Sequence, residues 1–79
     1  MQITYYAGAA DAAGTNTAQL DAGDLTASEL LARLSADNPA LGRVLGACSL
    51  LVDGASVRDP EEVIPGIARV DVLPPFAGG

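Results

Sequence analysis

The strongest helix signal in this chain begins at Thr26 and gives the fold one main helix to build around. Residues 26–29 read Thr-Ala-Ser-Glu. In this capping-box pattern the Thr26 hydroxyl accepts from the Glu29 amide, and the Glu29 carboxylate accepts from the Thr26 amide. An apolar stripe follows at helical spacing, made of Leu30, Leu31 and Leu34. Asn38-Pro39 then ends the helix. Because such a stripe faces a core, the sequence predicts a helix with one buried side.

The stretch before this helix has strand character at its start. Residues 2–7 are rich in β-branched and aromatic types. Alternation places Ile3 and Tyr5 on one face and Tyr6 on the other. Residues 8–16 are small and end in Gly-Thr-Asn, a composition that predicts a loop too long for a tight hairpin turn.

The other predicted elements are short segments separated by turns. In chain order they are a weak strand at 17–21, a short helical segment at 41–45 ended by Gly46, strands at 48–52 and 55–57 joined by Asp53-Gly54, a single helical turn at 59–62, a turn at Pro65-Gly66 and a last strand at 69–73. Alternation in the last strand places Val70 and Val72 inward. Two strands, a helix and then several short strands predict an α+β fold, in which one main helix packs across a mixed sheet.

The charge of the chain limits its partners. Ten acidic and four basic residues give a formal net charge of -6. The basic residues are all arginines, and they are scattered over Arg33, Arg43, Arg58 and Arg69. Phosphate binding requires clusters of cations, so we expect no nucleic-acid partner. Complementary charge instead favours a basic protein partner.

The chain offers few catalytic side chains of its own. It has no histidine and a single cysteine, Cys48. This composition excludes a Cys/His metal site, a Ser-His or Cys-His nucleophile pair and an internal disulfide. Cys48 is interpreted as a small buried hydrophobe, and the acidic segment 59–62 as a capped turn rather than a metal site. No stretch resembles a signal peptide or a membrane span, so a cytoplasmic location is expected.

The last six residues, Pro-Pro-Phe-Ala-Gly-Gly, read as a reactive arm rather than as packed structure. The two prolines keep the backbone extended, and the two final glycines can pass a slot too narrow for a Cβ. The group that such an arm presents is the α-carboxylate of Gly79. We therefore expect one domain at residues 1–73, near the lower size limit for a self-sufficient core, and a flexible tail at residues 74–79.

This ending, directly after the strand-like residues 70–73, resembles that of the MoaD/ThiS-like sulfur carriers. These are ubiquitin-like proteins of β-grasp fold, and the hexapeptide is most similar to that of the molybdopterin synthase small subunits. The resemblance implies that the first and last strands pair at the centre of the sheet. It also implies that Gly79 is the reacting residue and that the rest of the tail binds partners, through Pro74, Pro75, Phe76, Ala77 and Gly78.

The resemblance further implies a chemistry in which every catalytic side chain belongs to a partner. An adenylyltransferase similar to ubiquitin-activating enzymes would use ATP to adenylate Gly79, and a persulfide sulfur donor would convert it to a thiocarboxylate. The tail would then enter the large subunit of molybdopterin synthase and give its sulfur to a cyclic pyranopterin phosphate. No bound cofactor or metal is implied, and the chain would be a co-substrate and subunit rather than an enzyme alone.

Three alternative functions are compatible with the same fold. The first is a sulfur carrier for cysteine or thiazole biosynthesis, the second a ubiquitin-like modifier joined through Gly79 to a target lysine, and the third a β-grasp binding module with an incidental tail. The chain also departs from the small-subunit pattern: Ala10-Asp11 replaces a common Arg-Glu pair, Asp53 replaces a usual Asn, and Gly-Ile-Ala-Arg-Val at 66–70 replaces the common Gly-Asp-Glu-Val. These differences concern the identity of the partner rather than the sulfur chemistry.

The free energies of tail binding indicate that the folded domain must offer a docking surface in addition to the tail. Ordering six backbone residues costs on the order of 6 to 12 kcal/mol, and burying Phe76 returns only about 1.5 to 3 kcal/mol. The exposed face of the sheet must contribute the remainder. Tyr6 and Leu51 are the candidate docking residues, because they are large, apolar and off the inferred core face.

Overall fold

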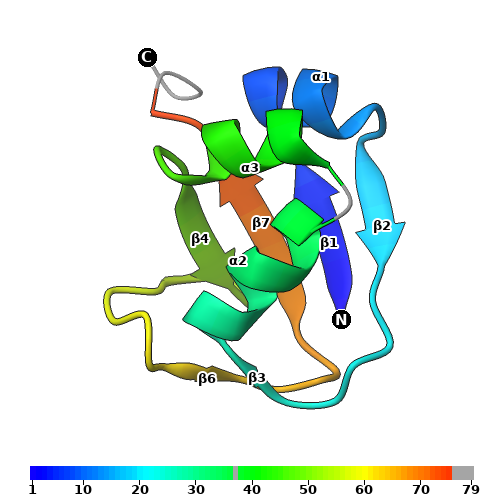
Figure 1. The fold of residues 1–79 in the computed structure, drawn as a ribbon. Helices are drawn as coiled ribbons and strands as arrows, with labels where there is room; N and C mark the ends of the chain where they lie inside the picture. The colour runs from blue at the N-terminus through cyan, green and yellow to red at the C-terminus, as the bar shows by residue number, and fades with distance from the viewer. Residues whose placement is uncertain (37, 76–79) are drawn as a thin grey trace.

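The computed structural model describes residues 1–36 and 38–75, and its main layer is a five-stranded sheet (Figure 1). The strands of this sheet are β1 (Gln2–Tyr5), β2 (Thr17–Gln19), β4 (Ser49–Val52), β5 (Ala55–Ser56) and β7 (Arg69–Leu73). Their order is β2-β1-β7-β4-β5. β1 and β7 pair parallel at the centre, and the other neighbours pair antiparallel. The first and last strands are therefore central neighbours, as the family resemblance implied.

Three helices accompany the sheet: α1 (Ala7–Ala13), α2 (Ala27–Ala36) and α3 (Pro39–Leu45). Helices α2 and α3 lie across one face, and α1 lies at the end toward which β1 and β7 run (Figure 1). The core lies between these layers, and its largest fully buried side chains are Ile3, Leu30, Ile64, Val70 and Val72. The predicted α+β fold, with a main helix packed across a mixed sheet, is confirmed. The predicted short helical segment at 41–45 is α3, which begins two residues earlier, and α1 is added.

The main helix begins as its sequence indicates. The Thr26 amide donates to Glu29 Oε1 at 2.9 Å, and the Glu29 amide donates to Thr26 Oγ1 at 3.1 Å. Both bonds of the predicted capping box are present, so two amides at the helix start are satisfied. The leucine stripe faces the core, with Leu30 fully buried and Leu31 and Leu34 half-buried.

The prediction of a loop at residues 8–16 is wrong, because most of this segment is α1. Five of the seven residues in Ala7–Ala13 are alanine, the residue with the highest intrinsic helix propensity. The helix ends at Gly14, whose φ of 77° gives the left-handed C-cap that glycine adopts at little cost. Ala9 is completely buried. Small side chains that suggested a loop instead let this helix approach the core closely.

Asn38 links the three helices. Its Oδ1 accepts from the Leu41 amide at 3.1 Å and so caps α3, with Pro39 at the first helical position. Its Nδ2 donates to the Ala12 carbonyl in α1 at 3.0 Å. The same residue that follows α2 therefore starts α3 and ties it to α1, and Gly46 ends α3 as predicted.

The turn at Asp53-Gly54 forms the predicted hairpin between β4 and β5. Both residues have positive φ, 49° for Asp53 and 87° for Gly54, as a two-residue hairpin turn requires. Asp53 is further held in place because its Oδ1 accepts from the Arg69 amide at 3.0 Å. The expected strands at 48–52 and 55–57 are each one residue shorter in the structure.

Two short strands outside the main sheet were not predicted. β3 (Leu25–Thr26) and β6 (Val63–Ile64) pair antiparallel, and each has only two residues. The prediction of a single helical turn at 59–62 is wrong, because this segment is a β-turn. The Glu62 amide donates to the Asp59 carbonyl at 3.0 Å and closes the turn. Asp59 still caps it, since its Oδ1 accepts from the Glu61 amide at 2.9 Å. A strand follows at once, so no helix can propagate.

Replacing Asn38 with alanine should destabilise the fold. Asn38→Ala removes the α3 cap and leaves the Ala12 carbonyl without this donor, so we expect a loss of about 1 to 2 kcal/mol in the free energy of unfolding. Urea denaturation followed by circular dichroism measures it. The matched control is Asn16→Ala, at an exposed turn position, which should cost less than about 0.5 kcal/mol. Equal losses in the two variants would contradict the linking role of Asn38.

The capping box predicts a specific pH dependence. Hydrogen bonds from the Thr26 amide and hydroxyl, and then the Arg33 charge, hold the pKa of Glu29 below its usual value. Its stabilising contribution is therefore present above the unfolded-state pKa and is lost as pH falls through the lower folded-state pKa. In urea denaturation from neutral pH to about pH 2, wild type should lose more stability than Glu29→Gln. Parallel curves for the two proteins would contradict the prediction.

Candidate functional site

The segment that leads into the tail is the central strand of the sheet. Residues of β7 pair with β1 on one side and with β4 on the other. The Tyr6 amide donates to the Val72 carbonyl at 3.2 Å and extends the β1 pairing beyond the end of that strand. Val70 and Val72 are completely buried. The base of the tail is therefore held from both sides and from the core.

The first two residues of the predicted tail lie at this end of the sheet. Pro74 is half-buried and Pro75 is exposed, directly after Leu73. The other tail residues named from the sequence lie outside the described residues: Phe76, Ala77, Gly78 and Gly79. Their predicted roles as partner-binding and reacting residues stay predictions.

The sheet face opposite the helices, here called the open face, carries the outward side chains of the central strands. The register places them in three rows across β1, β7 and β4. The row nearest the tail contains Leu73 and Ser49 and lies next to Tyr6, the middle row contains Thr4, Asp71 and Leu51, and the far row contains Gln2 and Arg69. Apolar side chains thus gather toward the tail, and polar side chains occupy the far row.

Tyr6 and Leu51, the candidate docking residues, both lie on the open face. Tyr6 is 42% exposed, and Leu51 is half-buried. The structure adds Leu73, a half-buried outward residue of β7 that sequence reasoning missed. The alternation that placed Val70 and Val72 inward also places Leu73 outward, so the signal was present.

A shallow cleft of about 420 Å³ crosses the open face. Its lining is mainly polar and consists of Tyr6, Asp53, Gly54, Arg69 and Asp71. The Tyr6 hydroxyl donates to Asp71 Oδ1 at 3.5 Å, which is at the outer limit for a hydrogen bond. Asp71 is a second residue that sequence reasoning missed, although alternation along β7 places it outward.

A second hollow of about 690 Å³ lies at the opposite end of the sheet. The loop 21–24 and the turn 65–67 line it, and Ile67 in that turn is 96% exposed. Gly66 packs against the Gly23 backbone so closely that a Cβ would lie 2.8 Å from a carbonyl carbon. The hollow is remote from Leu73, because β7 begins at this end and finishes at the other (Figure 1).

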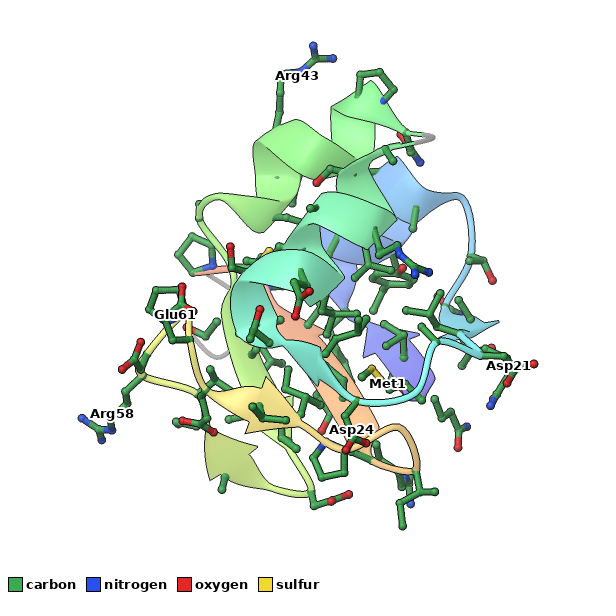
Figure 2. The ribbon with its side chains drawn as sticks, turned by 60° about the horizontal axis from the view of Figure 1, so that its bottom comes forward. Met1, Asp21, Asp24, Arg43, Arg58 and Glu61 are labelled. Atoms are coloured by element: carbon green, nitrogen blue, oxygen red, sulfur yellow. The ribbon has the colours of Figure 1, made fainter. Side chains whose placement is uncertain are left out.

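The other titratable residues form no site among the described residues. No group of three or more His, Cys, Asp or Glu within residues 1–36 and 38–75 is placed to hold a metal ion. Arg43 and Arg58 project from well-separated parts of the surface, at the top and the lower left of Figure 2. In the part of the chain that the structure describes, no helix combines the length and the apolar character needed to cross a bilayer.

Cys48 has the environment of a structural thiol. It is half-buried, and its Sγ donates to the Val44 carbonyl at 3.2 Å. Burial raises the pKa of the Cys48 thiol. Because the thiolate is the reactive form, these features support the interpretation of Cys48 as a small hydrophobe.

Alkylation should report this environment. We expect iodoacetamide to modify Cys48 several-fold more slowly in the folded protein than in denaturant at the same slightly alkaline pH, because burial keeps the thiol protonated and covered. Timed mass spectrometry gives both rates. A folded-state rate equal to the denatured rate would show instead that the thiol is accessible and reactive.

Comparisons with known proteins agree with this architecture. The profile described as the ThiS family matches residues 3–79. The molybdopterin synthase sulfur carrier subunit of Chlamydomonas reinhardtii is 31% identical over 81 residues, covering all of this chain and 98% of that protein. The crystal structure of SAMP1 from Haloferax volcanii is similar with a TM-score of 0.81 and 28% identity, over 100% of this chain and 98% of that one.

A further solved structure supports the fold alone. The small archaeal modifier protein 1 from Methanosarcina acetivorans has a TM-score of 0.80 at 23% identity, with 99% of this chain and 94% of that chain covered. The β-grasp, ubiquitin-like architecture expected from the sequence is thus shared with solved structures over nearly the full chain.

Proposed function

Because the chain belongs to the ThiS family, we propose that it is a sulfur carrier whose Gly79 carboxylate is adenylated and then converted to a thiocarboxylate. One observation carries the proposal: the hexapeptide 74–79 directly follows β7, which is clamped between β1 and β4. A rigid base lets a partner position the reacting carboxylate by binding the folded domain.

The chemistry follows from what a carboxylate can do. A free carboxylate is a poor acyl donor, so one of its oxygens first attacks ATP, pyrophosphate leaves and an acyl-adenylate forms. The terminal sulfur of a persulfide donor then attacks the acyl carbon, AMP leaves and an acyl disulfide forms. A second thiol of the donor or the activating enzyme cleaves its S–S bond, which releases the Gly79 thiocarboxylate and leaves a disulfide on the protein that supplied the thiols. The chain contributes the acyl group and the docking surface, and an activating enzyme similar to ubiquitin-activating enzymes contributes the catalytic side chains. On this proposal ATP is bound by the enzyme and not by the carrier.

We assign the sulfur to molybdopterin biosynthesis, with the chain acting as the small subunit of molybdopterin synthase. Two features support this assignment. The 31% identical Chlamydomonas protein is a molybdopterin synthase sulfur carrier subunit, and the prolines at 74 and 75 match the ending that resembles this branch. The large subunit of the synthase would then receive the tail. Carriers for thiazole or cysteine biosynthesis are the nearest alternatives with the same activation step.

A protein modifier is the second candidate function, and the similarity to SAMP1 favours it. That structure is 28% identical and matches the whole chain. Another crystal structure from H. volcanii carries the full name small archaeal modifier protein 1. In this function Gly79 would form an amide with a lysine of the target. The activation step is shared, so only the product distinguishes the two functions.

The mass of the C-terminal peptide tests the proposal. After incubation with ATP, a persulfide sulfur donor and the activating enzyme of the same organism, the wild-type peptide should gain the mass difference between sulfur and oxygen. A variant that lacks Gly78 and Gly79 should gain nothing, and its circular dichroism should show an intact fold. A wild-type peptide that keeps its unmodified carboxylate would overturn the sulfur carrier. Higher-mass conjugates that survive reducing denaturation in the host would support the modifier.

A further inference from the structure

Asp71 occupies an unusual place on the open face. It lies on the central strand β7, two residues before Leu73 and three before the start of the tail at Pro74. The register sets it between Thr4 of β1 and Leu51 of β4. A partner that takes the tail and docks on this face must therefore pass over the Asp71 carboxylate.

Asp71 lies at the boundary between the apolar and the polar part of the open face. By register, Tyr6 and Leu73 are its large neighbours toward the tail and Leu51 lies beside it in the middle row, and Asp71 itself is already half-buried. Among residues 1–36 and 38–75, the Tyr6 hydroxyl is the one side-chain donor to its carboxylate, and the distance of 3.5 Å is long. In the free protein, solvent supplies the remaining hydrogen bonds that an ionised carboxylate needs.

Docking of a partner on the open face changes the hydration of Asp71. Burying Tyr6, Leu51 and Leu73 is the favourable part of binding on this face, but the same contact removes water from Asp71. A charge that loses its water without gaining a partner opposes binding strongly. The covering surface must therefore bring its own donor to Asp71.

We propose that the activating enzyme places a cationic side chain, Arg or Lys, on Asp71 when it takes the tail. This inference rests on the proposed function, because it assigns the partner that adenylates Gly79. An arginine fits best: its planar group can pair with the carboxylate and lie against the Tyr6 ring. The chain's net charge of -6 favours a basic partner surface. A second copy of the chain is a poorer occupant, since both copies would carry a net charge of -6.

Arg69 of the same chain is the other cation that could pair with the Asp71 carboxylate. It lies on the same strand face, one row farther from the tail, and lines the same cleft. Its amide is bound to Asp53 Oδ1, which fixes its backbone but leaves the guanidinium to solvent or to Asp71. If Arg69 neutralised Asp71 in the complex, the enzyme would need no cation there, so the experiment includes Arg69.

Steady-state adenylation tests the inference. ATP–pyrophosphate exchange by the activating enzyme of the same organism is measured with wild type, Asp71→Asn, Arg69→Gln and Asp21→Asn as the varied substrate. Asp71→Asn should raise KM about tenfold and leave kcat unchanged, because a docking contact is lost and the chemistry is not. Asp21→Asn removes one charge from an exposed loop at the opposite end (Figure 2) and should change KM by less than about twofold. Arg69→Gln should not raise KM.

Each other outcome has a defined meaning. If wild type is not adenylated, the proposed function fails and this inference fails with it. If wild type is adenylated and Asp71→Asn keeps its KM, only this inference is overturned. An equal rise in Asp21→Asn would show that net charge alone guides docking, and an equal rise in Arg69→Gln would show that Arg69 supplies the cation. Circular dichroism of all variants confirms that each is folded.

Discussion

The parallel pairing of β1 with β7 is the constraint on which the rest of the structure depends. It joins the two ends of the domain in one hydrogen-bonded ladder, and it can form only after the intervening chain has crossed over. Helices α2 and α3 are part of this crossover and cover the buried face. Because β7 is central, the side chains of Val70 and Val72 lie in the core, and the strand that precedes the tail is among the most strongly held segments.

The pairing of β7 on both sides fixes the base of the tail in the folded domain. The domain contributes a fixed starting point for residues 74–79 and a surface beside it. That surface is apolar near Leu73 and polar toward Arg69, so on the proposed function the strand that precedes the tail would also set the orientation of a partner on it.

The small size of the core explains why local devices matter here. A chain of 79 residues has only a small net stability, because the loss of conformational entropy on folding offsets most of the free energy gained by burial. The Thr26–Glu29 capping box and the Asn38 link each satisfy backbone groups that would otherwise depend on water. The alanine-rich α1 extends the buried layer at low cost in side-chain entropy, and this compensates for a chain with only three aromatic residues.

Local sequence determined the elements whose signal is contained within a few residues. The capping box, the leucine stripe, the Asp53-Gly54 hairpin and the alternation of β7 each depend on neighbours in the chain, so they were predictable, as was the family resemblance. Tertiary structure decided the rest. Residues 7–13 form a helix in which Ala9 is completely buried in the core. Strands β3 and β6 exist because distant segments meet. Tyr6 and Leu51 become neighbours of Asp71 only through the pairing of β7 with β1 and β4, which no local pattern encodes.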